Sequence, residues 1–143
     1  MNILLHQSGV ANFADFGSAE FITEKSDILT GTEGTYHFMS PELCDPNVNE
    51  YSAKAADIWA LGVTLYCMVF NKLPFDARTE LEIFDTILKD EAKFEGRQIS
   101  DGLKDLIQKM LTKDVKNRAK INNLLQHPWL NEGYQLNLNE DGA

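Results

Sequence analysis

The sequence predicts a mainly α-helical domain with one small β-hairpin at its N-terminus. Three observations support this prediction. From Ile58 to Phe70 only Gly62 and Thr64 interrupt an apolar run, which is long enough for a core helix. Later stretches place apolar residues at helical spacing. Residues 3–16, by contrast, contain two short runs of strand character separated by a turn.

The composition limits the class of protein. A chain of 143 residues, 43% hydrophobic and 24% charged, is sufficient for one domain with a core. Its net charge of -9 argues against nonspecific binding to nucleic acid or to an anionic membrane, because both favour positively charged proteins. The two cysteines, Cys44 and Cys67, and the lack of a signal peptide predict an intracellular, cytoplasmic protein without a disulfide framework.

The first elements are expected to form the hairpin. Ile3-Leu4-Leu5 has strand character, residues 6–9 predict a turn, and residues 10–16 alternate sufficiently for a second strand. The polar stretch at residues 18–35 follows and predicts a long loop. Long loops in compact domains are usually functional or mobile.

The stretch from Ser52 to Phe70 is the predicted centre of the fold. Ser52 is a suitable N-cap. The apolar run predicts a helix that is buried on every side and is too short to span a membrane. Asp57 is the exception, since it places a carboxylate at the edge of a buried element. It is either a solvated charge near the positive helix end or an anchor for the backbone of a functional loop.

Shorter helices are predicted around this centre. Ser40-Pro41 opens one helix, Thr79 and Glu82 have the spacing of a capping box for a second, and Ser100 caps a third. A last short helix is expected to end at Pro128. The predicted apolar positions of the second, third and last of these helices are Leu81, Phe84 and Leu88; Leu103, Leu106, Ile107, Met110 and Leu111; and Ile121, Leu124 and Leu125.

The remaining segments are expected to lack regular structure. Residues 90–98 are polar and are predicted to be irregular. Trp129 and Leu130 are expected to pack back onto the body of the domain. Residues 134–143 form a polar, acidic stretch, which predicts a frayed tail.

An ordered set of short motifs gives the chemical signal. The motifs, in chain order, are Asp15-Phe16-Gly17, Ser40-Pro41-Glu42, Asp57 to Gly62, Arg118 and His127-Pro128-Trp129. Glu42 follows Asp15 by 42 − 15 = 27 residues. This set resembles the C-terminal lobe of a eukaryotic Ser/Thr protein kinase. The resemblance covers roughly residues 2–131, and it assigns residues 1–133 to a kinase-like C-lobe helical bundle without the N-lobe, followed by the tail.

The resemblance implies a Mg-ATP site at the end of the hairpin. Asp15 would hold the Mg²⁺ that bridges the ATP phosphates, and Asn2, 15 − 2 = 13 residues earlier, would hold a second Mg²⁺. Both side chains supply the hard oxygen ligands that Mg²⁺ prefers. Thr35 would steady the catalytic base and the substrate hydroxyl.

The resemblance also implies structural roles. Glu42 and Arg118 would form a buried ion pair beneath the substrate loop, the alternative being two solvated charges. Asp57 would hold the backbone of the catalytic loop from below. Trp59 and Gly62 belong to the structural motif of the central helix.

Several stretches resemble one subgroup, the calcium/calmodulin-dependent protein kinase kinases, which act on other kinases. They are Phe21, Ser26-Asp27, Leu29, Gly34-Thr35, Phe38-Met39, Leu61 to Cys67 and Leu103 to Ile107. This resemblance implies that Thr32 is the activating phosphosite, with Thr30 as the second candidate. The implied partners are protein substrates or other kinases, and calmodulin would act through regions outside this sequence.

The same resemblance finds no counterpart here for the glycine-rich loop, the phosphate-gripping Lys or the His-Arg-Asp that contains the catalytic base. The chain alone is therefore expected to be inactive and to bind Mg-ATP weakly, because phosphoryl transfer depends on positioning and charge stabilisation. The alternative is a non-catalytic docking or scaffold module with a kinase-like fold.

Two further expectations concern surfaces and metals. Without the N-lobe, four apolar side chains of the hairpin side would lose their cover and favour self-association. These are Ile3, Leu5, Phe13 and Phe16. No histidine metal site is expected, because the spacing of the three histidines fits none: His6, His37 and His127.

Overall fold

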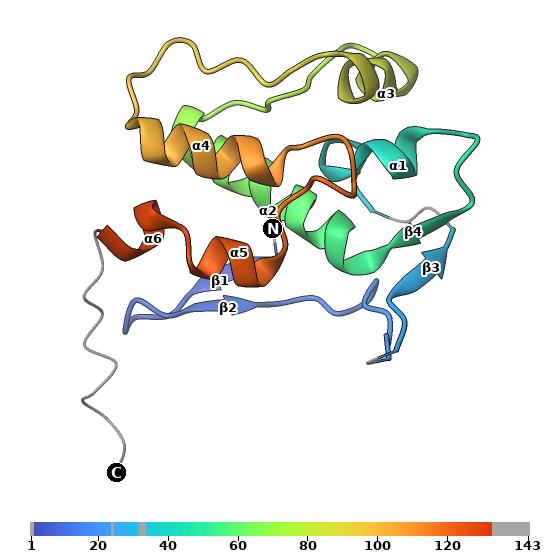
Figure 1. Cartoon of the computed structure of the whole chain (residues 1–143), viewed down its shortest axis with the longest axis horizontal. Coiled ribbons are helices and arrows are strands. Elements are labelled where there is room, and N and C mark those ends of the chain that lie inside the picture. Colours follow the sequence, from blue (N-terminus) through green and yellow to red (C-terminus); the bar gives the residue numbers. More distant parts are fainter. Residues whose placement is uncertain (1, 24, 32–33, 133–143) are drawn as a thin grey trace.

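The computed structural model describes residues 2–23, 25–31 and 34–132 (Figure 1). The predicted tail at residues 134–143 and the predicted phosphosite Thr32 lie outside the described residues. The elements, in chain order, are β1 (Ile3–Leu5), β2 (Ala11–Phe13), β3 (Ile28–Thr30), a 3₁₀ turn η1 (Tyr36–Phe38), α1 (Pro41–Cys44), β4 (Glu50–Ser52), α2 (Ala53–Phe70), α3 (Glu80–Lys89), α4 (Asp101–Met110), α5 (Ile121–Leu125) and α6 (Pro128–Glu132). The mainly helical prediction is confirmed.

The predicted N-terminal hairpin is present. Strands β1 and β2 pair antiparallel, with Ile3 opposite Phe13. The turn between them is closed by the Gly9 N–H, which donates to the His6 carbonyl oxygen at 2.9 Å. Gly9 has φ 85°, a left-handed conformation that favours glycine. The second strand is shorter than the predicted 10–16, since pairing ends at Phe13.

One strand of a second sheet lies inside the stretch that was predicted to be a loop. Strand β3 pairs antiparallel with β4, which leads directly into α2, and Thr30 lies opposite Glu50. The prediction of a structureless loop over residues 18–35 is therefore wrong at Ile28–Thr30. Residues 28–30 show no apolar–polar alternation that would predict a strand. Strand β3 forms because it pairs with β4, which follows η1 and α1 in the chain.

Helix α2 begins and ends as the sequence indicates. The Ser52 hydroxyl accepts from the Ala55 N–H at the N-terminus, and Asn71 adopts a left-handed C-cap. The prediction that α2 is buried on every side is wrong, because Leu61 and Met68 are exposed. Helix α2 therefore carries more apolar side chains than the other described residues cover.

By length and composition alone, α2 could also cross a membrane: it has 18 residues and a mean hydropathy of 1.3. The prediction that the run is too short for such a span does not hold by this measure. Core helices pass the same test, and α2 places Trp59, Val63 and Tyr66 in the core, so the observation is weak evidence for a membrane span.

Helices α3 and α4 have the predicted caps. Thr79 and Glu82 form a capping box on α3, and the Ser100 hydroxyl accepts from the Leu103 N–H on α4. The predicted apolar face of α3 is shifted, because the buried residues are Ile83 and Ile87, whereas the predicted Leu81 is exposed and Phe84 and Leu88 are half-buried. Both sets have helical spacing, so periodicity alone could not choose between them.

The C-terminal helices differ from the prediction. Helix α5 is followed by α6, which Pro128 opens, so α5 is not the last helix. Of its predicted apolar positions only Leu124 is buried, and Ile121 and Leu125 are exposed. Trp129 packs back onto the body as predicted, but Leu130 is exposed. Residues 90–98 lack regular structure, as predicted.

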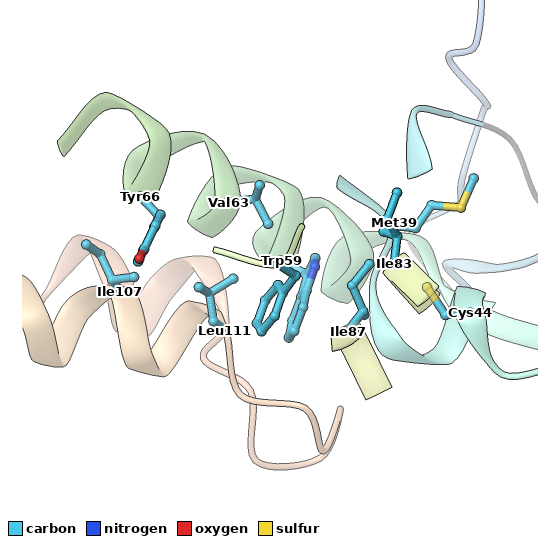
Figure 2. Close-up of a cluster of buried hydrophobic side chains, with 10 residues drawn as sticks. Met39, Cys44, Trp59, Val63, Tyr66, Ile83, Ile87, Ile107 and Leu111 are labelled. Atoms are coloured by element: carbon cyan, nitrogen blue, oxygen red, sulfur yellow. The ribbon is translucent and has the colours of Figure 1, made fainter. Parts of the chain in front are cut away.

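The core forms two clusters around α2. The larger joins η1, α1, α2, α3 and α4, and Figure 2 shows nine of its members: Met39, Cys44, Trp59, Val63, Tyr66, Ile83, Ile87, Ile107 and Leu111. The smaller cluster contains Ile58, Leu106, Met110 and Leu124. Gly62 permits the close approach of α2 to α4, because a Cβ there would lie 2.8 Å from the Met110 Cβ.

The hairpin lies below this core in Figure 1 and takes no part in either cluster. The four apolar side chains that were predicted to be uncovered are exposed: Ile3, Leu5, Phe13 and Phe16. Self-association through them remains a prediction.

Candidate functional site

The hairpin register brings Asn2 and Asp15 to the same end of the hairpin. Ile3 lies opposite Phe13, and the Ala14 N–H donates to the Asn2 carbonyl oxygen at 2.8 Å. Asp15 follows Ala14 directly, so the two predicted metal ligands are neighbours across the strand pair. Both side chains are exposed and accessible to a ligand.

Asp15 has an unusual backbone conformation. Its φ of 65° lies in the left-handed region, which residues other than glycine seldom occupy. The Asp15 Oδ1 accepts from the Gly17 N–H at 3.2 Å, which orients the carboxylate at the end of the hairpin. Such outliers persist where the surrounding structure fixes them, and they cluster at functional sites.

The donor set at this end fits a magnesium ion. Mg²⁺ is usually bound by one or two carboxylates together with waters and substrate phosphates. The Asp15 carboxylate and the Asn2 amide oxygen match the protein part of such a site. Within the described ranges there is no group of three or more His, Cys, Asp or Glu that could hold a metal.

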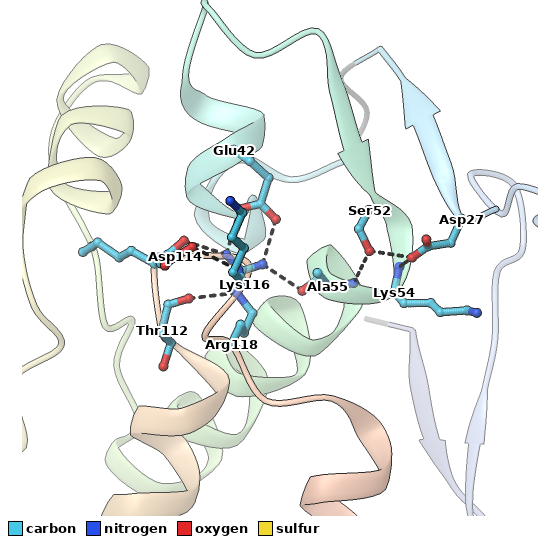
Figure 3. A network of polar contacts seen from close by, with 10 residues as sticks. Asp27, Glu42, Ser52, Lys54, Ala55, Thr112, Asp114, Lys116 and Arg118 are labelled. Atoms are coloured by element: carbon cyan, nitrogen blue, oxygen red, sulfur yellow. Dashed lines mark hydrogen bonds and ion pairs between the residues drawn. The ribbon is translucent and has the colours of Figure 1, made fainter.

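Arg118 and Glu42 form a bidentate ion pair (Figure 3). The Nη1–Oε1 and Nη2–Oε2 distances are both 2.7 Å, and the side chains are 0% and 8% exposed. Arg118 also donates to the carbonyl oxygens of Ala55, Thr112 and Lys113. The pair ties α1 to the start of α2 and to the loop after α4. The predicted pairing is present, and the alternative of two solvated charges is wrong.

Trp59 forms the apolar wall of this ion pair. The Arg118 guanidinium carbon lies 5.2 Å from the centroid of the fully buried Trp59 ring. Trp59 in turn stacks on Phe75, with centroids 5.6 Å apart and planes at 12°. A cation over an aromatic face is stabilised electrostatically, which helps to compensate for burial of the charge.

Asp27 makes hydrogen bonds that the sequence did not predict. Its carboxylate accepts from the Ser52 hydroxyl and from the Lys54 N–H, and its carbonyl oxygen accepts from the Ala53 N–H (Figure 3). The Ser52 hydrogen bond holds the pKa of Asp27 below its usual value. Asp27 therefore fastens the segment before β3 to the N-terminus of α2. The sequence signal was the acidic residue itself, but no local pattern identified Ser52 as its partner.

The other predicted site residues are separated from the hairpin end in the chain. Thr35 precedes η1 and is exposed, and Thr30 is an exposed residue of β3. Asp57 is exposed on the first turns of α2, yet desolvation by the surrounding chain raises the pKa of its carboxyl group. Among the described residues Asp57 has no hydrogen-bond partner, so its proposed role toward a loop backbone stays a prediction.

The histidines make hydrogen bonds instead of a cluster. The buried His127 pairs through Nε2 with the Asp105 carboxylate at 2.8 Å, and its Nδ1 accepts from the Trp129 N–H. His37 lies 3.4 Å from Asp76. These contacts join α4 to α6 and η1 to the segment after α2.

Comparison with known proteins gives one family. Residues 1–130 match the family model described as "Protein kinase domain". A calcium/calmodulin-dependent protein kinase kinase, cmkC of Emericella nidulans, is 37% identical over 130 residues, which are 90% of this chain and 25% of that protein. The serine/threonine-protein kinase GRIK2 of Arabidopsis thaliana is 37% identical over 133 residues, 90% of this chain and 31% of that protein.

A third relative, the serine/threonine-protein kinase ssp1 of Schizosaccharomyces pombe, is 35% identical over 141 residues, which cover 92% of this chain and 22% of that protein. This chain thus spans less than a third of the length of the curated relatives it matches.

Proposed function

Because this chain belongs to the protein kinase domain family, we propose that it forms the C-terminal lobe of a Ser/Thr protein kinase. The activity of the whole protein would be transfer of the γ-phosphate of Mg-ATP to Ser or Thr of a protein substrate. The observation that supports this most is the hydrogen bond from the Ala14 N–H to the Asn2 carbonyl oxygen, which brings the backbones of Asn2 and Asp15 to the same end of the hairpin.

Each predicted site residue would have one role in phosphate transfer. When bound, Mg²⁺ and ATP supply the phosphoryl group and neutralise the charge on its oxygens. The Asp15 carboxylate and the Asn2 amide oxygen would hold the metal. The Gly17 N–H, which donates to the Asp15 Oδ1 at 3.2 Å, would orient the carboxylate, and the exposed Thr35 would orient the substrate hydroxyl.

The buried ion pair would keep the substrate side of the lobe rigid. Glu42 stands in α1, directly after η1 and Thr35, and Arg118 fixes it to α2 through Ala55. Catalytic groups misplaced by about 1 Å lose large factors in rate. The pair therefore supports the position of Thr35 without contacting substrate.

We further propose that the 143-residue polypeptide by itself does not transfer phosphate at a measurable rate. It contains no G-x-G-x-x-G run and no His-Arg-Asp, the motifs that cover the phosphates and supply the base in protein kinases. Asp15 and Asn2 alone can only hold metal.

A role as a kinase that acts on other kinases is the finer proposal. It is supported by the similarity to the calcium/calmodulin-dependent protein kinase kinase of Emericella nidulans and by the subgroup motifs of the sequence. Thr32 remains the favoured activating phosphosite, because a phosphate on Thr30 would face Glu50 on the paired strand. Calmodulin dependence would reside in other parts of the whole protein.

A chimaera tests the proposed function. Residues 1–130, which match the family model, would replace the aligned stretch of the Emericella nidulans kinase, and phosphate transfer to a Ser/Thr protein substrate would be measured. We expect Mg-ATP-dependent activity that Asp15→Asn abolishes and Asp101→Asn leaves unchanged. A folded chimaera that transfers no phosphate, or one whose activity survives Asp15→Asn, would contradict the proposal.

A further inference from the structure

A groove lies between α1 and α3, two helices that are in contact near the upper right of Figure 1. We call it the α1/α3 groove, with residues 42–51 on one wall and residues 80–88 on the other. Its volume is ≈ 980 Å³, at the upper end of ligand pockets, which are roughly 300–1,000 Å³. Tyr36 and Phe84 also line it and pack edge to face, with centroids 5.7 Å apart.

Apolar side chains stand uncovered on both walls of the α1/α3 groove. Leu81 of α3 is 78% exposed, and Val48 on the opposite wall is 40% exposed. Leu81 lies in the first turn of α3, whose buried residues are Ile83 and Ile87, so it is not part of the core. A large apolar side chain inserted between Leu81 and Val48 would remove apolar surface from water on both walls.

The charged side chains that line the α1/α3 groove are negative. Every charged side chain among its described lining residues is acidic: Glu42, Asp45, Glu80, Glu82 and Asp85. Arg118 neutralises Glu42, and Lys89 pairs with Asp85 at 2.9 Å. Among the described residues the Asp45 and Glu82 carboxylates accept from neutral donors and form no ion pair. Within the described part of the chain Glu80 has no hydrogen-bond or ion-pair partner.

From this complementarity we propose that the α1/α3 groove docks a peptide segment of a partner protein in which one large apolar residue is flanked by Lys or Arg. The apolar residue enters between Leu81 and Val48, and the cations lie toward Glu80, Glu82 and Asp45. The proposal goes beyond phosphate transfer, because it concerns a binding surface separate from the hairpin end. The proposal concerns binding only, so its test can succeed or fail independently of whether the chain is part of an active kinase.

Fluorescence anisotropy with the full 143-residue chain tests it. The probe is a labelled peptide with one leucine between two Arg-Arg pairs in a Gly-Ser background. Two control peptides replace the leucine by serine or the arginines by glutamate. We expect the probe to bind, more weakly at high salt, and both control peptides to bind at least about tenfold more weakly, a factor equivalent to 1.4 kcal/mol.

Matched variants locate the binding. Leu81→Glu is compared with Met68→Glu, since Met68 is a 75% exposed residue of α2 outside the groove. Glu80→Lys is compared with Asp101→Lys, because both acidic residues directly follow an N-cap and Asp101 lies outside the groove. We expect the groove variants to weaken binding about tenfold or more and the controls to change it less than about twofold. Circular dichroism confirms that each variant is folded.

Three results would overturn the proposal. One is failure of the basic, leucine-containing probe to bind the folded chain. Another is an equal loss of affinity in the groove variants and their controls, which would indicate a general attraction to an acidic protein. The third is a dimer of the unmodified chain that Leu81→Glu dissociates, which would make a second copy the occupant.

Discussion

Arg118 and Glu42 are 76 residues apart in the sequence and meet in a buried ion pair with two N–O distances of 2.7 Å. The loop after α4 is thereby fastened to α1 through a single guanidinium. Because the Arg118 side chain is 0% and the Glu42 side chain 8% exposed, removal of one partner leaves a largely buried, uncompensated charge.

The first prediction concerns this pair. Arg118→Ala should lower the free energy of unfolding by about 3–5 kcal/mol, measured by urea denaturation, because Glu42 is stranded and the carbonyl oxygens of Ala55, Thr112 and Lys113 lose their donor. Lys89→Ala is the control, because Lys89 forms a surface pair with Asp85 and such pairs contribute about 0–1 kcal/mol. Equal effects of the two substitutions would show that the Arg118 pair is not buried in solution.

A second prediction tests the contact between α2 and α4. Gly62→Ala should destabilise the chain by about 1–3 kcal/mol, although alanine is the better helix former, because its Cβ would lie 2.8 Å from the Met110 Cβ and 3.0 Å from Leu111 Cδ2. Gly102→Ala in α4 is the matched control, since its Cβ would meet only the Trp129 side chain at 3.3 Å. A Gly62→Ala protein that melts at or above the temperature of the unmodified chain would contradict this packing.

The elements that the sequence predicted correctly are those with local signals. The capping box of Thr79 and Glu82 and the Ser52 cap are fixed by residues within one helical turn, and the structure places them as expected. The hairpin likewise depends on a turn and two adjacent runs. The pairing of Arg118 with Glu42 was available only through the resemblance, because no periodicity relates two residues so far apart.

The elements that the sequence missed are set by distant partners. Strand β3 exists because β4 lies beside it, and Asp27 is held by Ser52, 25 residues later. The choice of Ile83 over Leu81 as the buried position of α3 depends on how the helix rotates against α1 and η1. Such choices follow from tertiary packing, which local spacing does not encode.

A third prediction concerns pH. The Ser52 hydrogen bond holds the pKa of Asp27 in the folded chain below that of a free aspartate, so the carboxylate contributes stability that is present above the unfolded-state pKa and is lost as the pH falls through the folded-state pKa. Asp27→Asn should therefore destabilise the chain at neutral pH, and the difference from the unmodified chain should vanish in acid. In a Ser52→Ala background the effect of Asp27→Asn should shrink, because the hydrogen bond is already gone. A difference that persists unchanged after the pH has fallen through the folded-state pKa of Asp27 would contradict the contact.

A fourth prediction concerns the uncovered hairpin. Light scattering should detect dimers or larger species of the 143-residue chain, because the apolar side chains of Leu5, Phe13 and Phe16 are exposed on the hairpin side. Leu5→Glu together with Phe13→Glu should shift the distribution toward monomer, whereas Met68→Glu should not. A monomer at all accessible concentrations would show that the hairpin side does not associate.

The most direct test of the central claim is paramagnetic broadening by Mn²⁺, a substitute for Mg²⁺, in the ¹⁵N-labelled chain with ATP present. If Asp15 and Asn2 hold the metal, the amide signals of Ala14 to Gly17 should broaden first, and Asp15→Asn should abolish that broadening while Asp101→Asn leaves it intact. Broadening that spares the hairpin end, or that persists unchanged in Asp15→Asn, would contradict the assignment of this end of the hairpin as the metal site.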